Sequence, residues 1–279
     1  MQQKPDIKKL LENVASLPDH LVELARSALI IAMSEYADLD VEAYLARLEG
    51  LAARLRSNVT SLDSPQEKIA AINNLLFTEE GFRGNPEDYY DPRNSFLNEV
   101  LDRKLGIPIT LSIVYIEVGR RAGIPFYGIG LPGHFIVGLA TGTDRVYIDP
   151  FNEGRILSVE DCRLLTQAFW THSRPLDPRV FDPVWPKPML VRLMRNLKTI
   201  YWQLGSQDQA WRMIEWILII DPDLPLELRE RGLLREAIGD PSGAVADFSR
   251  YLLLSPESED SESVRQRIEA LRTQKTVIH

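Results

Sequence analysis

His134 and Asp149 are the two residues whose types and spacing best suit acid–base chemistry in this sequence. His134 opens the apolar run HFIVGLA, Asp149 closes the run VYID, and the turn-forming letters TGTD lie between the two runs. A turn centred on residues 142 and 143 makes the numbers of paired residues sum to about 285, which places Asp149 diagonally across from His134 on one sheet face. A carboxylate in that position fixes the imidazole tautomer and leaves the other ring nitrogen to act as a base.

The group that such a base would deprotonate has three candidates. Thr110 stands at the start of an apolar helical segment, where His134 and the helix N-terminus could activate it. Ser112 lies deeper in that segment, and Cys162, the only cysteine, follows both His134 and Asp149 in the chain. Helix capping is the ordinary role of such a threonine, and a lone cysteine usually packs as a small buried residue. The sequence leaves all three open.

Four further residues are candidates for binding. The side-chain amides of Asn94 and Asn98 could donate hydrogen bonds to a developing oxyanion, although turn and helix capping are also common roles for asparagine. Tyr90 and Phe135 are the candidate aromatic contacts. The sequence contains no HExxH motif, phosphate-binding loop, dinucleotide fingerprint or metal-ligand cluster, so neither a metal site nor a cofactor is predicted.

The elements that must position these residues follow two different periods. Apolar residues at three- and four-residue spacing predict amphipathic helices near 21–32, 41–55, 65–76, 96–105 and 108–123. The stretch 81–94 is rich in Gly, Asn, Pro and Asp and predicts a long ordered loop. FYGIGL, HFIVGLA and RVYID predict three antiparallel strands, and an S-x-x-D capping box at Ser158 predicts a helix to about Trp170. The predicted class is α+β, with N-terminal helices and a small antiparallel sheet.

The C-terminal third has a different organisation. Five prolines within 173–188 predict a stiff connector and therefore a domain boundary. Beyond it the sequence repeats at an offset of 34 residues, which pairs Gly205 with Gly239 and Ala210 with Ala244. A helix–turn–helix period of this length, with small residues where helices approach, is typical of tetratricopeptide repeats. The predicted division is a first domain, the connector and an all-helical repeat domain, at 1–172, 173–188 and 189–279.

The segments NSFLNEVL, GIPITL, PGHF and YIDPF together resemble the SirB-type branch of the transglutaminase-like superfamily, between about residues 28 and 157. The resemblance implies a papain-like core in which a nucleophilic cysteine opens a helix while a histidine and an aspartate occupy neighbouring strands; tetratricopeptide repeats often follow. His134 and Asp149 stand at the latter two positions, whereas the cysteine position falls on 108–110, which reads Pro-Ile-Thr. Because a thiol is far more nucleophilic than an alcohol at neutral pH, its absence argues against transglutaminase or cysteine-protease chemistry.

Composition narrows the classes of partner and the location. With 32 Lys and Arg against 40 Asp and Glu, the net charge is −8, so neither nucleic acid nor an anionic membrane is a predicted partner. A single cysteine excludes an intrachain disulfide framework. No apolar stretch approaches the roughly 18 residues that a membrane span needs. These features predict a cytoplasmic protein without a membrane span.

Three functions are compatible with these residues. The leading hypothesis is a protein-interaction or assembly and regulatory factor, a pseudoenzyme with a protein or peptide partner, because the cysteine is missing. The competing hypothesis is an acyl-transfer or amide-hydrolysing enzyme with Thr110, or less favourably Ser112, as nucleophile. In that enzyme His134 would act as base and Asp149 would orient it. The third is a small-ligand pocket built from the same pair and the aromatic loop at Tyr89, Tyr90 and Phe96.

Overall fold

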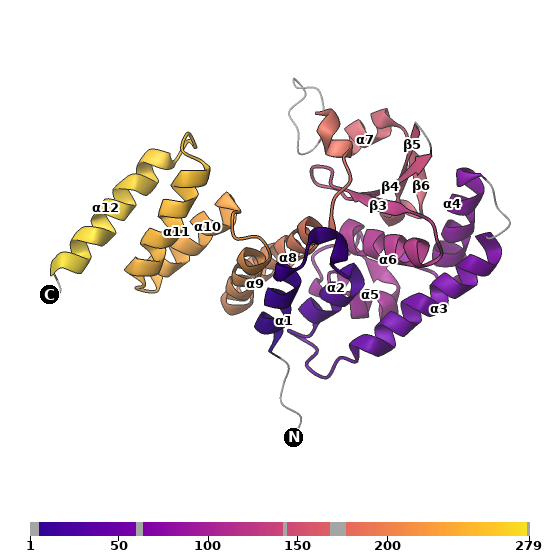
Figure 1. The fold of residues 1–279 in the computed structure, drawn as a ribbon, viewed down its shortest axis with the longest axis horizontal. Helices are drawn as coiled ribbons and strands as arrows, with labels where there is room; N and C mark the ends of the chain where they lie inside the picture. The colour runs from indigo at the N-terminus through magenta and orange to yellow at the C-terminus, as the bar shows by residue number, and fades with distance from the viewer. Residues whose placement is uncertain (1–5, 60–63, 142–143, 168–176, 278–279) are drawn as a thin grey trace. The chain divides into compact units, whose positions relative to one another are not determined.

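The fold is seen in a computed structural model, which describes residues 6–59, 64–141, 144–167 and 177–277 (Figure 1). The chain separates into two compact units, Met1–Leu193 and Met194–His279. The first unit combines helices with a small antiparallel sheet, and the second is built from helices. The predicted α+β class is therefore confirmed.

The first unit begins with helices, three of which have N-terminal caps formed by a residue visible in the sequence. They are α1 Ile7–Ser16, α2 Leu24–Ala32, α3 Val41–Val59 and α4 Pro65–Asn73, with the short helices η1 Asp19–Leu21 and η2 Asn74–Glu79. Ser64 and Glu67 form a capping box at the start of α4, and Pro65 occupies the first turn, where its missing N–H is harmless. Asp40 accepts a hydrogen bond from the amide of Ala43 at the start of α3. The three predicted N-terminal helices are confirmed.

Helix α6, Pro108–Arg121, is the centre of the first unit. Every residue from Pro108 to Gly119 is buried, because α6 packs against α3 and against strands of the sheet (Figure 1). Such a helix has to be apolar around most of its circumference. The shorter helix α5, Leu97–Arg103, precedes it, and the two-residue strands β1 Arg83–Gly84 and β2 Leu105–Gly106 pair in parallel.

The sheet has four antiparallel strands in the order β3-β4-β5-β6. They are β3 Phe126–Ile129, β4 Ile136–Thr141, β5 Asp144–Asp149 and β6 Arg155–Leu157. Val137 pairs with Ile148, which is the predicted register, while residues 142 and 143 of the predicted turn lie outside the described residues. The three predicted strands are confirmed, and β6 was missed because three residues are too few to show an alternating pattern.

The outer edge of β3 is covered by a segment that returns from far along the chain. The amide of Val184 donates to the carbonyl of Gly128 over 2.8 Å and forms a single β-bridge. This segment follows the short helix η5 Pro178–Phe181. We call residues 183–186, Pro-Val-Trp-Pro, the strap.

Helix α7, Val159–Thr166, follows the sheet. It begins at the predicted capping box, in which Ser158 and Asp161 bond each other's backbone amides. Residues 168–170, the end of the predicted helix, and 173–176, the start of the predicted connector, lie outside the described part of the chain.

The second unit contains the predicted repeat. Helix α8, Pro186–Gln203, crosses the boundary between the units and is followed by α9 Gln207–Ile220, α10 Pro225–Ala237, α11 Pro241–Leu254 and α12 Ser261–Val277. α9 and α11 each have 14 residues and begin 34 positions apart. Gly205 and Gly239 both take a left-handed φ, 71° and 79°, just after the preceding helix. The 34-residue period is confirmed.

The start of α8 differs from the predicted connector. α8 begins at Pro186, so the last three residues of the segment 173–188 are helical. The first helical turn accepts Pro186 and Pro188 because its backbone amides have no partner within the helix. Proline density in this segment therefore marked the start of a helix.

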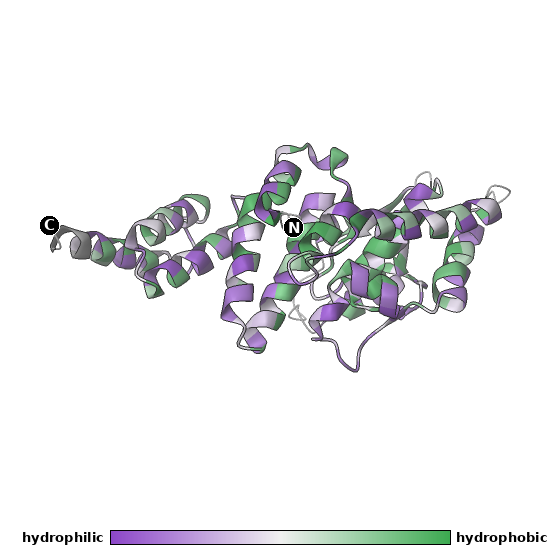
Figure 2. Cartoon of the chain, turned by 90° about the horizontal axis from the view of Figure 1, so that it is seen from below, coloured by the Kyte–Doolittle hydropathy of each residue, from purple (hydrophilic) through white to green (hydrophobic). Residues whose placement is uncertain are grey.

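Small residues and buried charge hold α10 against α11. A methyl group on Gly232 would lie 2.6 Å from the ring of Phe248, so the two helices approach more closely than a larger residue allows. Arg231 and Arg235 both donate hydrogen bonds to the buried carboxylate of Asp247. Figure 2 shows hydrophobic and hydrophilic residues alternating along the helices, which is the pattern of amphipathic helices.

Candidate functional site

His134 lies in a tight turn between β3 and β4. Gly133 takes a left-handed φ of 72°, and the amide of His134 donates to the carbonyl of Leu131 over 3.2 Å. The guanidinium of Arg192 donates to the carbonyls of Leu131 and His134 over 3.0 and 2.7 Å. These bonds fix the backbone from which the imidazole extends.

Asp149 ends β5 and caps the short helix η4, Pro150–Asn152. Its Oδ1 accepts from the amide of Phe151 over 3.1 Å, and its Oδ2 accepts from Nδ2 of Asn152 over 2.7 Å. The same Oδ2 lies 3.0 Å from Nε2 of His134, so the predicted His–Asp contact is confirmed. Asp149 is 1% exposed and His134 is 9% exposed, so water competes weakly for this contact.

This contact sets the tautomer of the imidazole when the ring is neutral. An ionised carboxylate only accepts hydrogen bonds, so Nε2 of His134 carries the proton that it donates to Asp149. Nδ1 of the neutral ring then carries the lone pair, and among the described residues it has no hydrogen-bond partner. The geometry is that of an oriented base with one available nitrogen.

A row of aromatic rings extends from the imidazole. The ring of Phe151 lies edge-on to His134 at 6.0 Å between centroids, and Tyr89 contacts Phe151 at 6.3 Å. Tyr90 contacts Tyr89 at 5.4 Å and is 55% exposed. Burial raises the pKa of Tyr89, so its hydroxyl stays protonated at neutral pH. The predicted binding residue Tyr90 is thus linked to His134 through two other rings.

Thr110 is buried, and its hydroxyl is held by the backbone around it. Oγ1 accepts from the amide of Ile107 over 3.1 Å and lies 2.8 Å from the carbonyl of Asn94, to which it donates. Ser112 is also buried, and its hydroxyl donates to the carbonyl of Phe135 over 3.4 Å. Among the described residues, no hydrogen bond joins either hydroxyl to His134. Thr110 is the third residue of α6, and its bond from the amide of the N-cap residue Ile107 is one half of a capping box.

Cys162 lies in α7 within an apolar cluster that includes Leu157 and Phe181. Burial raises the pKa of its thiol to about 12, with small contributions from the charges of Asp161 and Asp149. The thiolate is the nucleophilic form, so this cysteine is unreactive at neutral pH.

The predicted binding residues Asn94, Asn98 and Phe135 lie in three different surroundings. Asn94 ends the short helix η3, Pro92–Asn94, and its Nδ2 donates to the carbonyl of Asp88 over 2.7 Å. Asn98 lines a separate cleft of about 510 Å³ whose walls include the carboxylates of Glu99 and Asp102. Phe135 is 1% exposed, with the guanidinium of Arg192 5.4 Å from its ring centroid. Their binding roles stay predictions.

Two residues of the site were missed in the sequence. A local pattern could have predicted Asn152, because an asparagine three residues after the aspartate of an Asp-Pro pair is well placed to donate a hydrogen bond to that aspartate. No such pattern marks Arg192, because it lies 58 residues from His134 in the chain and reaches it only through the tertiary fold.

Two searches of the described residues have negative results. In those ranges no three His, Cys, Asp or Glu side chains gather in the way a metal ion requires. No helix within them combines the length and hydrophobicity needed to cross a bilayer.

Comparison with known proteins defines the class of this protein. Residues 42–195 match the model of the transglutaminase-like superfamily, and residues 197–269 match a tetratricopeptide repeat model. The chain belongs to the transglutaminase-like superfamily, and tetratricopeptide repeats follow that domain.

The chain belongs more narrowly to the UPF0162 family. It is 38% identical to a UPF0162 protein of Xylella fastidiosa over 273 residues, which cover 97% of both chains. A UPF0162 protein of Vibrio cholerae is 28% identical over 73% of this chain and 76% of its own length. F-box only protein 21 of Mus musculus is 30% identical over 57% of this chain, a stretch that covers 25% of that protein.

Proposed function

We propose that this protein is a protein-interaction factor of the SirB-type branch, in which the transglutaminase-like domain is a scaffold and not a conventional cysteine-dependent catalyst. The observation that carries the proposal is the hydroxyl of Thr110, which is held by the backbone at the start of α6, within the stretch 108–110 where the resemblance places the nucleophile. The same proposal includes a cytoplasmic location, which the single unpaired cysteine supports.

The surroundings of Thr110 support the scaffold role. Attack by its oxygen would require the hydroxyl to leave the amide of Ile107 and the carbonyl of Asn94. Each lost hydrogen bond to a buried backbone group costs about 1 kcal/mol or more. The bond to Asn94 also ties the loop 81–94 to the start of α6, so the hydroxyl has a structural role that accounts for it.

The repeat unit supports a protein partner. Tetratricopeptide repeats stack helix pairs and bind peptides or neighbouring domains on their surfaces. Among the exposed apolar side chains in this unit are Leu226, Ile238 and Leu253, at 64%, 70% and 68% exposure. Burial of such side chains by a partner would remove apolar surface from water and so favour association.

Quantitative affinity capture of the full-length protein from its native cells tests the proposal. A protein partner should be recovered in stoichiometric amount with the wild type and equally with Thr110→Val, because no nucleophile is needed. Asp247→Ala removes the carboxylate that Arg231 and Arg235 share, and should reduce the recovery. Repeated recovery of the chain alone, at several salt concentrations, would contradict the proposal.

The second candidate is the acyl-transfer or amide-hydrolysing enzyme, and one observation favours it. Asp149 bonds Nε2 of His134 and leaves Nδ1 as a base, with Thr110 as the candidate nucleophile. Turnover of a peptide library by the wild type and Thr110→Ser, but not by Thr110→Val or His134→Gln, would replace the scaffold proposal. Equal background hydrolysis in all four proteins would eliminate the enzyme.

A further inference from the structure

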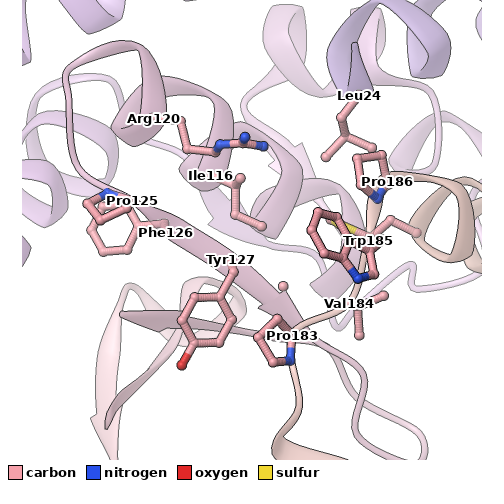
Figure 3. Close-up of a pocket in the computed structure, with 12 residues that line it drawn as sticks. Leu24, Ile116, Arg120, Pro125, Phe126, Tyr127, Pro183, Val184, Trp185 and Pro186 are labelled. Atoms are coloured by element: carbon pink, nitrogen blue, oxygen red, sulfur yellow. The ribbon is translucent and has the colours of Figure 1, made fainter. Parts of the chain in front are cut away.

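An apolar pocket lies beside the C-terminal half of α6. It has a volume of about 250 Å³ and is lined by residues of α2, α6, β3, the strap and the start of α8 (Figure 3). Four buried apolar side chains form its floor: Leu24, Ile116, Phe126 and Met189. More exposed residues form its rim: Arg120, Pro125, Tyr127, Pro183 and Trp185. All of these residues belong to the first unit.

The rim carries a cation, Arg120, that has no counter-ion among the residues the structure describes. Figure 3 shows the side chain of Arg120 extending over Ile116, with the indole of Trp185 on the other side of the pocket. Within the described ranges, Arg120 forms no hydrogen bond or ion pair, and none of the residues that line the pocket is acidic. The adjacent Arg121 is paired with both Glu117 and Glu49. Of these two neighbouring arginines on α6, Arg121 therefore has its charge compensated by carboxylates. The charge of Arg120 is not compensated by the described residues and lies beside an apolar surface.

The strap makes this pocket rigid before any ligand arrives. Pro183 and Pro186 have fixed φ angles, and Val184 between them is bonded to Gly128. Trp185 is held between these restraints and is 56% exposed. A wall that is already ordered loses little conformational entropy when a ligand binds.

We propose that this pocket binds a carboxylate attached to a short apolar or aromatic group. The guanidinium of Arg120 supplies two parallel N–H donors that match a carboxylate, and the apolar floor receives the attached group. Ligand pockets usually range from about 300 to 1,000 Å³, so a volume of about 250 Å³ favours a group the size of one amino-acid side chain. The C-terminal residue of a protein chain and a free aryl-alkyl acid share this chemistry.

This inference does not depend on the proposed scaffold role, because among the described residues no hydrogen bond joins a residue that lines the pocket to Thr110 or His134. Titration calorimetry with the full-length protein tests it. The probes are 3-phenylpropionate, its neutral amide, an N-acetylated tetrapeptide ending in Phe with a free carboxylate, and the same peptide as its C-terminal amide.

At least one of the two acids should bind, and its amide should bind at least about tenfold more weakly, because a charge-assisted hydrogen bond is lost. Arg120→Gln should lower the affinity of the acid by a similar factor. Arg121→Gln removes the same charge one position away and serves as the matched control, in which the affinity should change less than about twofold. Binding of the peptide acid alone identifies a chain terminus as the ligand, and binding of phenylpropionate alone identifies a free acid.

Three results would overturn the inference: no binding by either acid, equal binding of acid and amide, or an unchanged affinity in Arg120→Gln. Thermal unfolding of both variants, compared with the wild type, ensures that a lost affinity does not reflect a lost fold.

Discussion

The two ends of α6 handle polar side chains in opposite ways. At the N-terminal end, Thr110 caps the helix, and the nearby His134 and Asp149 bond each other. At the C-terminal end, Arg120 has no partner among the described residues and lies beside an apolar pocket. At the first end the hydroxyl of Thr110 is engaged by the backbone and only Nδ1 of His134 stays available, whereas the second end leaves a whole guanidinium beside an apolar surface. A candidate site is therefore judged by the hydrogen bonds its residues still have available.

The largest effect is expected at the N-terminal end, from Asp149→Ala. The change removes three hydrogen bonds, to His134, Asn152 and the amide of Phe151, and the donor on His134 is left buried. We expect a loss of about 3 kcal/mol in the free energy of unfolding, measured by urea denaturation. Asp149→Asn keeps an acceptor oxygen and should lose less. A loss below about 1 kcal/mol in the alanine variant would show that the stability of the fold does not depend on these three hydrogen bonds.

Gly119→Ala should affect the C-terminal end through packing. A methyl group at this position would lie 2.2 Å from Cδ2 of Phe126, which forms part of the pocket floor. We expect a destabilisation of about 2 kcal/mol and weaker binding of 3-phenylpropionate, because the ring must move. The control is Gly50→Ala in α3, where the added methyl meets nothing within 4 Å and should stabilise by up to about 1 kcal/mol. Equal stability of the two variants would contradict the close contact.

Asp91→Asn tests the charge pairing beside the N-terminal end, with a defined pH dependence. Burial opposes the charge of Asp91, but hydrogen bonds from Arg93 and the charge of Arg103 outweigh it and lower the pKa below its ordinary value of 3.8. A carboxyl whose pKa is lowered by folding contributes its full stabilisation at a pH above its unfolded-state pKa. This stabilisation is lost as the pH falls through the folded-state pKa. At pH 7 the free energy of unfolding of the wild type should therefore exceed that of Asp91→Asn by about 1 kcal/mol. In urea titrations this difference should shrink below pH 3.8; a difference that grows on acidification would refute the assignment.

The smallest effect on stability is expected for Arg120→Ala. Because this side chain pairs with none of the described residues, its removal should change the free energy of unfolding by less than about 0.5 kcal/mol. Urea denaturation with and without 3-phenylpropionate separates the two contributions, since ligand should stabilise the wild type and not the variant. A large loss without ligand would mean that Arg120 serves the fold, and would remove the contrast between the two ends.

The His–Asp contact could be predicted because a single turn joins the two strands and sets their register. Once Val137 pairs with Ile148, the positions of His134 and Asp149 follow within a few ångströms. The repeat was equally predictable, because small residues recur at a constant spacing of 34 positions. Both features depend on contacts between neighbouring segments of the chain.

The pocket and the support of His134 could not be predicted in this way. Arg192 reaches the carbonyl of His134, and Val184 reaches Gly128, across more than fifty intervening residues. No local pattern marks such partners, and Arg120 has the same local sequence context as the fully paired Arg121. Thr110 was ambiguous for a related reason, since the acceptor that engages it, the carbonyl of Asn94, belongs to a loop without periodicity.

The strap also changes how this protein behaves in a crowded solution. An uncovered edge strand presents N–H and C=O groups to strands of neighbouring chains and so invites aggregation. The amide of Val184 donates a hydrogen bond to the carbonyl of Gly128. The prolines at 183 and 186 have no N–H with which to extend the pairing to another chain. One β-bridge between two prolines thus limits self-association through the β3 edge of this sheet, and a change that loosened it would open that edge to pairing with another chain.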